Sequence, residues 1–436
     1  MRSRLLAGAV LALVAVAAWL AIRFTLLARL LQGAILLSLV YVAYLAWLGW
    51  RVMRDAPAIA SVRPDDPPSL TVLVPAQNES AVIGDCVRDL ALQDYAGPLQ
   101  IIVIDDGSTD GTDAAARLAL AGLPPERAAR VSLVRREPGQ GPATKGAALA
   151  YAHPFVTGEV VGVLDADSRL EPNFLERVIA SWAVDPSAAG IQAQRRPHNA
   201  ERGWLTAAQD EELVMDMVSQ CGRWSTDGTA EMRGTGMFLR REALERVGGW
   251  SEQAITEDLE ISTRLAAAGE RITLAPGAVL GEEAVVQPRA LWRQRMRWAE
   301  GSMRRLIELG PGLVANRRLP LERRVNFLMF VTEFVVPPLF VASIAASLIT
   351  IPLPRPADWT VPASLFVGYG LGTFLLALGG LAAHGERGWR LVGRATRGAL
   401  WLSHWLIVVP AALMKIAFLA PSTVFARTPR APRAEP

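Results

Sequence analysis

Long apolar segments near both ends of the chain constrain its fold most strongly. Leu5–Ile22 and Leu30–Trp50 carry no charged residue, and each is long enough to cross a hydrocarbon core. Further apolar runs follow at Phe327–Ile351, Val361–Ala383 and Leu400–Phe425. The last contains a proline and a lysine, so it could span the membrane, re-enter it or lie at its interface. A cleaved signal peptide is the alternative for the first run, but a second span follows without a polar cleavage region.

Arginines near the ends of these runs predict sidedness. They follow the second run, precede the third and follow the fourth: Arg51, Arg54, Arg317, Arg318, Arg323, Arg324, Arg387, Arg390, Arg394 and Arg397. Because positive charge accumulates on the cytoplasmic side, the region between the second and third runs is expected to face the cytoplasm. The basic tail at 426–436 also favours the cytoplasm, whereas a simple fifth span would place it outside, and the sequence leaves this open.

Charge and cysteine content exclude several classes of function. The formal net charge is +3, and all 45 basic residues except Lys145 and Lys415 are arginine. We interpret this as a compositional bias of the genome, because no aromatic-rich groove or zinc spacing accompanies it, and we expect no nucleic-acid partner. Cys86 and Cys221 show no metal-ligand spacing and fit a reducing compartment. Nothing in the sequence indicates an oligomeric state.

Between the apolar runs, strand and helix patterns alternate. Short β-branched runs that end in polar loops predict strands at Leu70–Val74, Leu99–Ile104, Val131–Val134 and Val160–Leu164. Helical spacing predicts helices at Ala81–Leu92, Asp113–Leu120 and Thr144–Tyr151. This alternation is typical of an α/β domain with a mostly parallel sheet covered on both faces. In such sheets, ligands bind at the carboxyl ends of the strands.

Acidic residues fall at those carboxyl ends. Asp105 and Asp106 enter a Gly-Ser turn, and they either serve the turn alone or accept hydrogen bonds from the base or ribose of a nucleotide. Asp165 and Asp167 follow a wholly apolar strand and could offer oxygen ligands to Mg²⁺ or Mn²⁺ bound to a diphosphate. An Asp-x-Asp pattern alone is weak evidence, but its position after the Asp-Asp turn strengthens it.

Three further motifs complete the series. Thr256-Glu257-Asp258 starts a helix that runs to Ala268, where the acids either favour the helix dipole or make Asp258 a general base. Such a base permits a single, inverting displacement without a protein nucleophile. Gly234-Thr235-Gly236 permits close approach of the backbone to a sugar or acceptor, or forms a turn before the next strand. Lys145 could reach a phosphate or be an ordinary surface lysine.

Gln294, Arg297 and Trp298 lie on a basic amphipathic stretch, Arg289–Arg305, that is typical of a helix in the headgroup region. Either these side chains are interfacial anchors only, or Arg297 neutralises diphosphate oxygens while Trp298 contacts the acceptor.

Together, the motifs between residues 69 and 310 resemble those of membrane-integrated family 2 inverting glycosyltransferases of the GT-A fold. The resemblance implies nucleotide-sugar contacts at Pro75, Asn78, Glu79, Asp105, Asp106, Lys145, Asp165 and Arg297. It implies a metal site at Asp165 and Asp167, catalytic roles for Glu257, Asp258 and Arg297, and acceptor contacts at Gly234, Thr235, Gly236, Gln294 and Trp298. The segment Gly139–Lys145 departs from the glycine-rich turn of similar proteins, which weakens the assignment of Lys145.

Within this branch, Arg233–Phe238, Gly248–Trp250, Glu282-Glu283 and Arg297–Gly301 are most similar to bacterial glucosyldiacylglycerol synthases. The resemblance implies transfer of glucose from a UDP-sugar to diacylglycerol, with β configuration, at the cytoplasmic face of a bacterial inner membrane. A processive synthase of poly-N-acetylglucosamine, hyaluronan or a cellulose-like polymer is the alternative, disfavoured by the few short spans and by the lack of a long C-terminal regulatory domain. An inactive scaffold is disfavoured by the intact acidic motifs.

The expected organisation therefore has six parts. These are two transmembrane helices in 1–56, a linker at 57–68, a GT-A domain at 69–287, amphipathic interfacial helices at 288–324, two to three transmembrane or re-entrant helices at 325–425, and a basic tail at 426–436.

Overall fold

The computed structural model describes residues 2–228, 230–353 and 359–419, and these form two compact units. The sheet unit comprises residues 53–213 and 230–286, and the helical unit comprises the other described residues. Helices α2 (Thr25–Ala60) and α8 (Trp204–Ser225) contribute to both units. The predicted basic tail at 426–436 lies outside the described residues.

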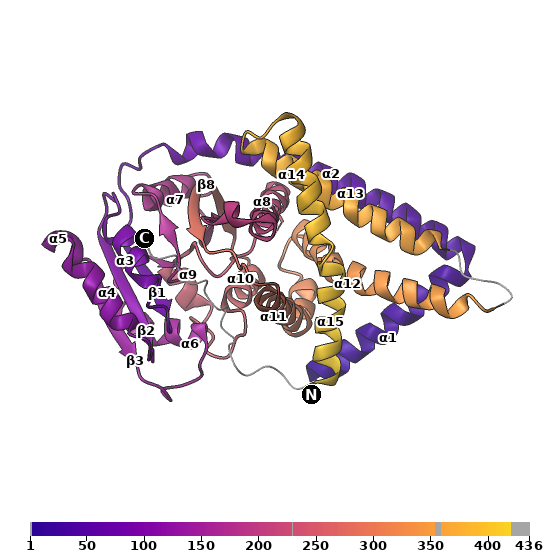
Figure 1. Ribbon diagram of the computed structural model, residues 1–436, viewed down its shortest axis with the longest axis horizontal. Helices are drawn as coiled ribbons and strands as arrows, with labels where there is room; N and C mark the ends of the chain where they lie inside the picture. Colours follow the sequence, from indigo (N-terminus) through magenta and orange to yellow (C-terminus); the bar gives the residue numbers. More distant parts are fainter. Residues whose placement is uncertain (1, 229, 354–358, 420–436) are drawn as a thin grey trace. The chain divides into compact units, whose positions relative to one another are not determined.

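The sheet unit contains a mixed eight-stranded sheet in the order β3-β2-β1-β4-β7-β6-β8-β5 (Figure 1). Its strands are β1 Leu70–Ala76, β2 Leu99–Asp106, β3 Val131–Arg136, β4 Val160–Val163, β5 Arg169–Leu170, β6 Gly190–Pro197, β7 Met237–Arg240 and β8 Ile272–Glu282. The half formed by β3, β2, β1 and β4 is parallel, and β6 pairs in parallel with β8, whereas β7 is antiparallel to both of its neighbours. The predicted α/β domain with a mostly parallel sheet is therefore confirmed.

Helices cover both faces of this sheet. They are α3 Ile83–Ala91, α4 Thr112–Ala121, α5 Pro125–Ala128, α6 Lys145–Ala152, α7 Phe174–Trp182, α9 Arg241–Arg246 and α10 Glu257–Ala267, with 3₁₀ turns at His153–Phe155 and Ala200–Arg202. Val72 and Val74 of β1 belong to a core shared with α3, α4 and α7. Since side chains alternate along a strand, Leu73 faces the other side, where α6 packs on β1 to β3. Both faces are thus buried, which explains the unbroken apolar runs.

The linker expected at 57–68 begins later, because α2 continues through Pro57 to Ala60. The physical reason is packing within the sheet unit: Ala56 and Ala60 are both 5% exposed, and they lie against Gly277 of β8. A Cβ added at Gly277 would lie 2.5 Å from the carbonyl oxygen of Ala56. Only glycine leaves room for this helix end.

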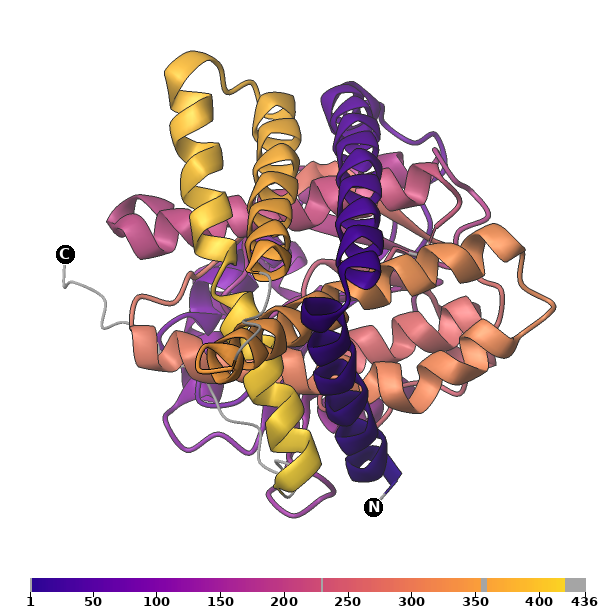
Figure 2. The same ribbon diagram turned by 90° about the vertical axis from the view of Figure 1, so that its right-hand side faces the viewer.

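The helical unit consists mainly of α1 Arg2–Arg23, most of α2, α11 Pro288–Ala315, α12 Leu321–Thr350, α13 Thr360–Ala383, α14 Gly388–Leu402 and α15 Trp405–Phe418. Helices α1, α11 and α12 pack on α15, while α13 and α14 run side by side (Figures 1 and 2). Within the described residues, five helical segments are long and apolar enough to cross a membrane: 3–23, 25–60, 321–350, 360–383 and 388–418.

Two boundaries in this unit differ from the sequence prediction. Helix α12 begins at Leu321 rather than at residue 325, because Pro320 provides a fixed φ of −51° immediately before its first turn. The last predicted apolar segment, Leu400–Phe425, begins in the final residues of the amphipathic α14 and continues as the apolar α15 after Ser403–His404, and its residues 420–425 lie outside the described residues.

Candidate active site

The register of the parallel strands brings the predicted nucleotide-binding residues to one edge of the sheet. Ala76 at the end of β1 is paired with Asp105 of β2, and Leu73 of β1 with Val163 of β4. The chain therefore leaves all three strands at neighbouring positions. Pro75 is the penultimate residue of β1, and Asn78, Asp106 and Asp165 lie at these strand ends, as is usual for ligand sites in open α/β sheets.

The loop after β1 is held by the loop after β2. Asn78 has a positive φ of 56°, its backbone N–H donates to Ser108 Oγ over 2.9 Å, and its Oδ1 accepts from Thr109 N over 2.7 Å. The backbone N–H of Glu79 donates to Thr112 Oγ1 over 2.9 Å. The Asn78 side chain thus shapes the loop.

Asp105 and Asp106 each pair with the arginine directly opposite on β3. Asp105 Oδ2 accepts from Arg135 Nη1 and Asp106 Oδ1 from Arg136 Nε, both over 2.6 Å. Asp105 also accepts from Ser108 N over 2.9 Å, and its side chain is 3% exposed against 11% for Asp106. Asp105 therefore supports the turn, and Asp106 is the better placed of the two for a nucleotide.

Lys145 joins three predicted site residues. Its Nζ lies 2.5 Å from Asp165 Oδ1, 2.5 Å from the carbonyl oxygen of Gly234 and 3.5 Å from Glu257 Oε1. Thr144 caps the helix that begins at Lys145, because its Oγ1 accepts from Ala147 N over 3.1 Å. The cap fixes the point from which the lysine side chain extends. With 13% of its side chain exposed, Lys145 is therefore a largely enclosed member of the candidate site and not an ordinary surface lysine.

Burial and neighbouring charges oppose each other in this cluster. Burial favours a neutral Lys145, but the carboxylates of Asp165 and Glu257 outweigh it and raise the pKa of the lysine above its usual value. Burial raises the pKa of Glu257 to about 7, against the opposing charge of Lys145. Burial also raises the pKa of Asp258, while a backbone N–H bond and the cations Lys145 and Arg233 limit the rise. A carboxylate in this state accepts a proton more readily than an exposed aspartate.

The turn at residues 233–236 lies against the Asp258 carboxylate and the Lys145 ammonium group. Gly234 has φ +78°, and a Cβ added there would be 3.3 Å from Asp258 Oδ2 and 3.8 Å from Lys145 Nζ. Gly236 has φ +67° and donates its N–H to the carbonyl oxygen of Val163 over 3.0 Å. Between them, Thr235 is 1% exposed, and its hydroxyl lies within the protein. The two glycines provide the close approach that the sequence predicts, but the Thr235 hydroxyl has protein partners.

Asp165 and Asp167 present oxygen donors that suit a hard cation. The Asp165 side chain is 42% exposed, whereas that of Asp167 is buried and its Oδ2 accepts from Glu283 N over 3.3 Å. Among the described residues, no group of three or more His, Cys, Asp or Glu side chains is arranged to hold a metal ion. Mg²⁺ is commonly held by one or two carboxylates together with substrate phosphates, so this pair fits that mode.

Several residues near the site belong to none of the sequence motifs. Arg135 and Arg136 could have been predicted as site residues, because they directly follow the predicted strand Val131–Val134, the next strand along the chain after Asp105-Asp106. Gln192 of β6 could not: it is 1% exposed, and it donates to the carbonyl oxygen of Thr235 and accepts from Arg233 N, over 2.9 and 2.8 Å. A buried glutamine gives no hydrophobic signal.

The motif Gln294–Trp298 lies on α11 in the helical unit. Gln294 Oε1 accepts from Arg295 Nη1 over 2.9 Å, and the Arg295 guanidinium lies 4.1 Å from the centre of the Trp298 ring. Two residues after Trp298, Glu300 is 1% exposed and accepts from Lys415 Nζ of α15 over 2.8 Å. Arg304 also donates to Glu300. These bonds link the motif helix to the last apolar helix.

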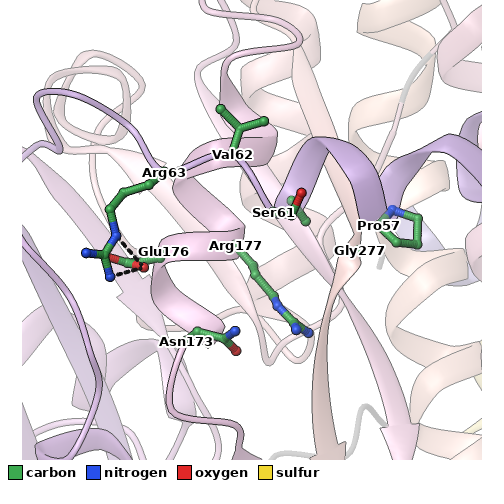
Figure 3. Close-up of a pocket in the computed structure, with 9 residues that line it drawn as sticks. Pro57, Ser61, Val62, Arg63, Asn173, Glu176, Arg177 and Gly277 are labelled. Carbon is green, nitrogen blue, oxygen red and sulfur yellow. Dashed lines mark hydrogen bonds and ion pairs between the residues drawn. The ribbon is translucent and has the colours of Figure 1, made fainter.

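A separate pocket of about 350 Å³ lies in the sheet unit between the end of α2, the start of α7 and Gly277 (Figure 3). Its charged side chains are paired: Arg63 Nε lies 3.0 Å from Glu176 Oε1, and Arg177 Nη1 lies 3.0 Å from Glu171 Oε2. None of the predicted site residues lines it. We therefore place the candidate active site at the strand ends and not in this pocket.

Known proteins are similar to this chain in sequence and in fold. The family described as "Glycosyltransferase like family 2" matches residues 67–301. The "Beta-monoglucosyldiacylglycerol synthase" of Synechocystis sp. is 31% identical over 360 residues, 80% of this chain and 72% of that protein. The protein of the same name from Nostoc sp. is 30% identical over 357 residues, 80% of this chain and 74% of that protein.

One solved structure shares the fold across most of the chain. The mannosyltransferase PcManGT from Pyrobaculum calidifontis, in complex with GDP-Man and Mn²⁺, gives a TM-score of 0.55 at 22% identity and covers 89% of this chain and 99% of that chain. At this identity, the likeness concerns the fold alone.

Proposed function

Because the chain belongs to the glycosyltransferase-like family 2, as the motifs predict, we propose that it transfers glucose from a UDP-sugar to diacylglycerol and forms a β-glucolipid. The observation that carries the proposal is the similarity to two beta-monoglucosyldiacylglycerol synthases over 80% of the chain. This similarity extends over more residues than the family match, so it includes part of the apolar helices as well as the sheet unit.

In the proposed reaction, Asp258 is the general base. The acceptor hydroxyl gives its proton to the Asp258 carboxylate as its oxygen bonds to the anomeric carbon of the sugar. The bond from that carbon to the diphosphate oxygen breaks in the same step, and the electron pair leaves with the nucleotide. One displacement inverts the configuration, so an α-linked donor yields a β-glycoside. The negative charge of Glu257 and the positive charge of Lys145 partly offset one another beside the Asp258 carboxylate.

The nucleotide-sugar is assigned to the strand ends. Asp106 and Glu79 are proposed to contact the base or ribose, with Pro75, Asn78 and Asp105 shaping the loops around them. Asp165 and Asp167 would hold Mg²⁺ or Mn²⁺, which neutralises the diphosphate and stabilises the leaving nucleotide. Before any donor binds, the Lys145 ammonium already offsets the charge of Asp165, to which it is bonded.

We assign the lipid to the helical unit and to α11. Gln294, Arg297 and Trp298 are the proposed contacts for substrate, and Gly234 and Gly236 allow the backbone to approach the sugar. Segments able to cross a membrane support a membrane-bound enzyme, and we propose that residues 69–287 form a catalytic domain at the cytoplasmic face of a bacterial inner membrane.

The test uses membranes that contain the full chain, labelled UDP-glucose, Mg²⁺ or Mn²⁺, and diacylglycerol. We expect label in the organic phase, a rate about 10²- to 10⁴-fold lower with Asp258→Asn, and no label after removal of divalent metal by EDTA. UDP-galactose and UDP-N-acetylglucosamine serve as competing donors. Label found only in alcohol-insoluble polymer would replace the lipid proposal with a polysaccharide synthase.

A further inference from the structure

The hydroxyl of Thr235 holds the segment that carries both proposed metal ligands. Thr235 Oγ1 accepts from the backbone N–H of Asp165 over 3.0 Å and lies 3.2 Å from Ser168 Oγ. Thr235 is 1% exposed and Ser168 is fully buried. One hydroxyl thus bonds to the first residue of the Asp165–Ser168 segment and to its last.

Hydrogen bonds to the backbone also hold the residues around Thr235 in place. Gln192 bonds to the residues on either side of the Gly234 peptide, because its Nε2 donates to the carbonyl oxygen of Thr235 and its Oε1 accepts from Arg233 N. The N–H of Gly236 bonds to Val163, the last residue of β4. The turn is therefore tied to β6 and β4 by hydrogen bonds, and the Thr235 hydroxyl is an acceptor at the point where the chain leaves β4.

We infer that Thr235 is a positioning residue for Asp165 and Asp167, and that its hydroxyl serves this segment and not the acceptor. The inference rests on the proposed function, because it takes these two aspartates as the metal ligands. Val has the shape of Thr, but Thr235→Val leaves the Asp165 N–H without this acceptor and the buried Ser168 hydroxyl without this partner. The segment then loses the bond that sets the direction of both carboxylates.

Thr71 offers a matched control at the opposite end of the same strands. Its Oγ1 accepts from Gly158 N over 2.9 Å and donates to Gln100 Oε1 over 2.7 Å, and the residue is fully buried. Thr71→Val therefore removes the same kind of bonds at a distance from the site. Thr235→Ser keeps the hydroxyl and tests for rescue.

The experiment measures Mn²⁺ binding to the full-length protein in detergent with saturating UDP, by the electron paramagnetic resonance signal of free Mn²⁺. Loss of an outer-shell partner typically weakens metal binding by about 10- to 100-fold, and we expect this for Thr235→Val. Thr235→Ser and Thr71→Val should bind Mn²⁺ as the wild type does, and the two valine variants should melt at similar temperatures.

Wild-type Mn²⁺ affinity in Thr235→Val would overturn the inference while leaving the glucosyltransferase proposal intact. Equal weakening in Thr71→Val would also overturn it, because the effect would then be one of stability. Thr235-dependent Mn²⁺ binding in a protein that transfers no glucose to diacylglycerol would support the inference and reject the proposed acceptor. A wild-type protein that binds no Mn²⁺ would overturn the inference, whereas the glucosyltransferase proposal is decided separately by the transfer of label to the organic phase.

Discussion

Gly234→Ala should separate the chemistry of the site from its stability. Gly234 has φ +78°, and an alanine in this left-handed conformation costs roughly 1–2 kcal/mol. For a domain of 150–250 residues, each kcal/mol lowers Tm by about 2–4 °C, so the substitution should lower Tm by about 2–8 °C. The new Cβ would also lie 3.3 Å from Asp258 Oδ2, so the carboxylate has to move by a few tenths of an ångström.

Displacement of Asp258, the proposed general base, should lower kcat more than the accompanying loss of stability would lower it. A misplacement of 1 Å can cost about 100-fold in rate, so a smaller shift should lower kcat by about 10-fold or more. Gly249→Ala is the matched control, since Gly249 has φ +72° and no atom within 4 Å of an added Cβ. It should show the same fall in Tm with nearly unchanged kcat.

The assay compares initial rates of organic-phase label at saturating donor and acceptor, below the melting temperature of both variants. Equal kcat values for Gly234→Ala and Gly249→Ala would refute the placement of Asp258 beside this turn. A fall in kcat confined to Gly234→Ala would support it.

Three further outcomes are expected. Asp258→Asn should lower kcat by about 10²- to 10⁴-fold while Mn²⁺ and UDP binding persist, and near-normal turnover would remove Asp258 from the role of base. Lys145→Met should move the acid limb of the kcat–pH profile to higher pH, because Lys145 lowers the pKa of Asp258 against the effect of burial; a limb that moves to lower pH would contradict this. Lys415→Met should destabilise the detergent-solubilised protein by about 1.5–3 kcal/mol, the usual worth of a hydrogen bond to a charged group, since Glu300 retains Arg304. A double-mutant cycle that combines Lys415→Met with Glu300→Gln should give a non-additive change in the free energy of unfolding, and additive changes would count against a direct Glu300–Lys415 bond.

Hydrophobic pattern predicts the parallel half of the sheet and the strand after the Gly234–Gly236 turn, but not β5, β6 or β8. Strands β1, β2 and β4 are buried on both faces, so they appear as apolar runs with polar ends. Strand β6 gives no such signal, because Gln192 and Gln194 are buried at 1% and 0% exposure and are held by hydrogen bonds. Helix α8 is similar, since Glu211 is fully buried within it. Where polar groups form the core, periodicity of apolar residues is absent.

The motifs identify the acidic residues of the site, but not which of them are already bonded to the protein. Asp105 and Asp106 look equivalent in the sequence, yet the structure buries Asp105 in its turn and leaves Asp106 nearer the surface. Lys145 follows an atypical loop, which weakens its assignment, yet its ammonium group bonds to Asp165 and Gly234. These contacts join residues far apart in the chain, so no local spacing predicts them.

The turn at residues 233–236 links the two halves of the proposed chemistry. The Gly234 carbonyl accepts from Lys145, its α-carbon lies beside Asp258, and the adjacent Thr235 hydroxyl holds Asp165. The proposed base, Asp258, and the proposed metal ligand Asp165 therefore lie against consecutive residues, and Gln192 bonds to Arg233 and Thr235 on either side of Gly234. In the proposed reaction, the spacing between the Asp258 carboxylate and the diphosphate would depend on this turn, and an inverting displacement requires that spacing because both groups act in the same step.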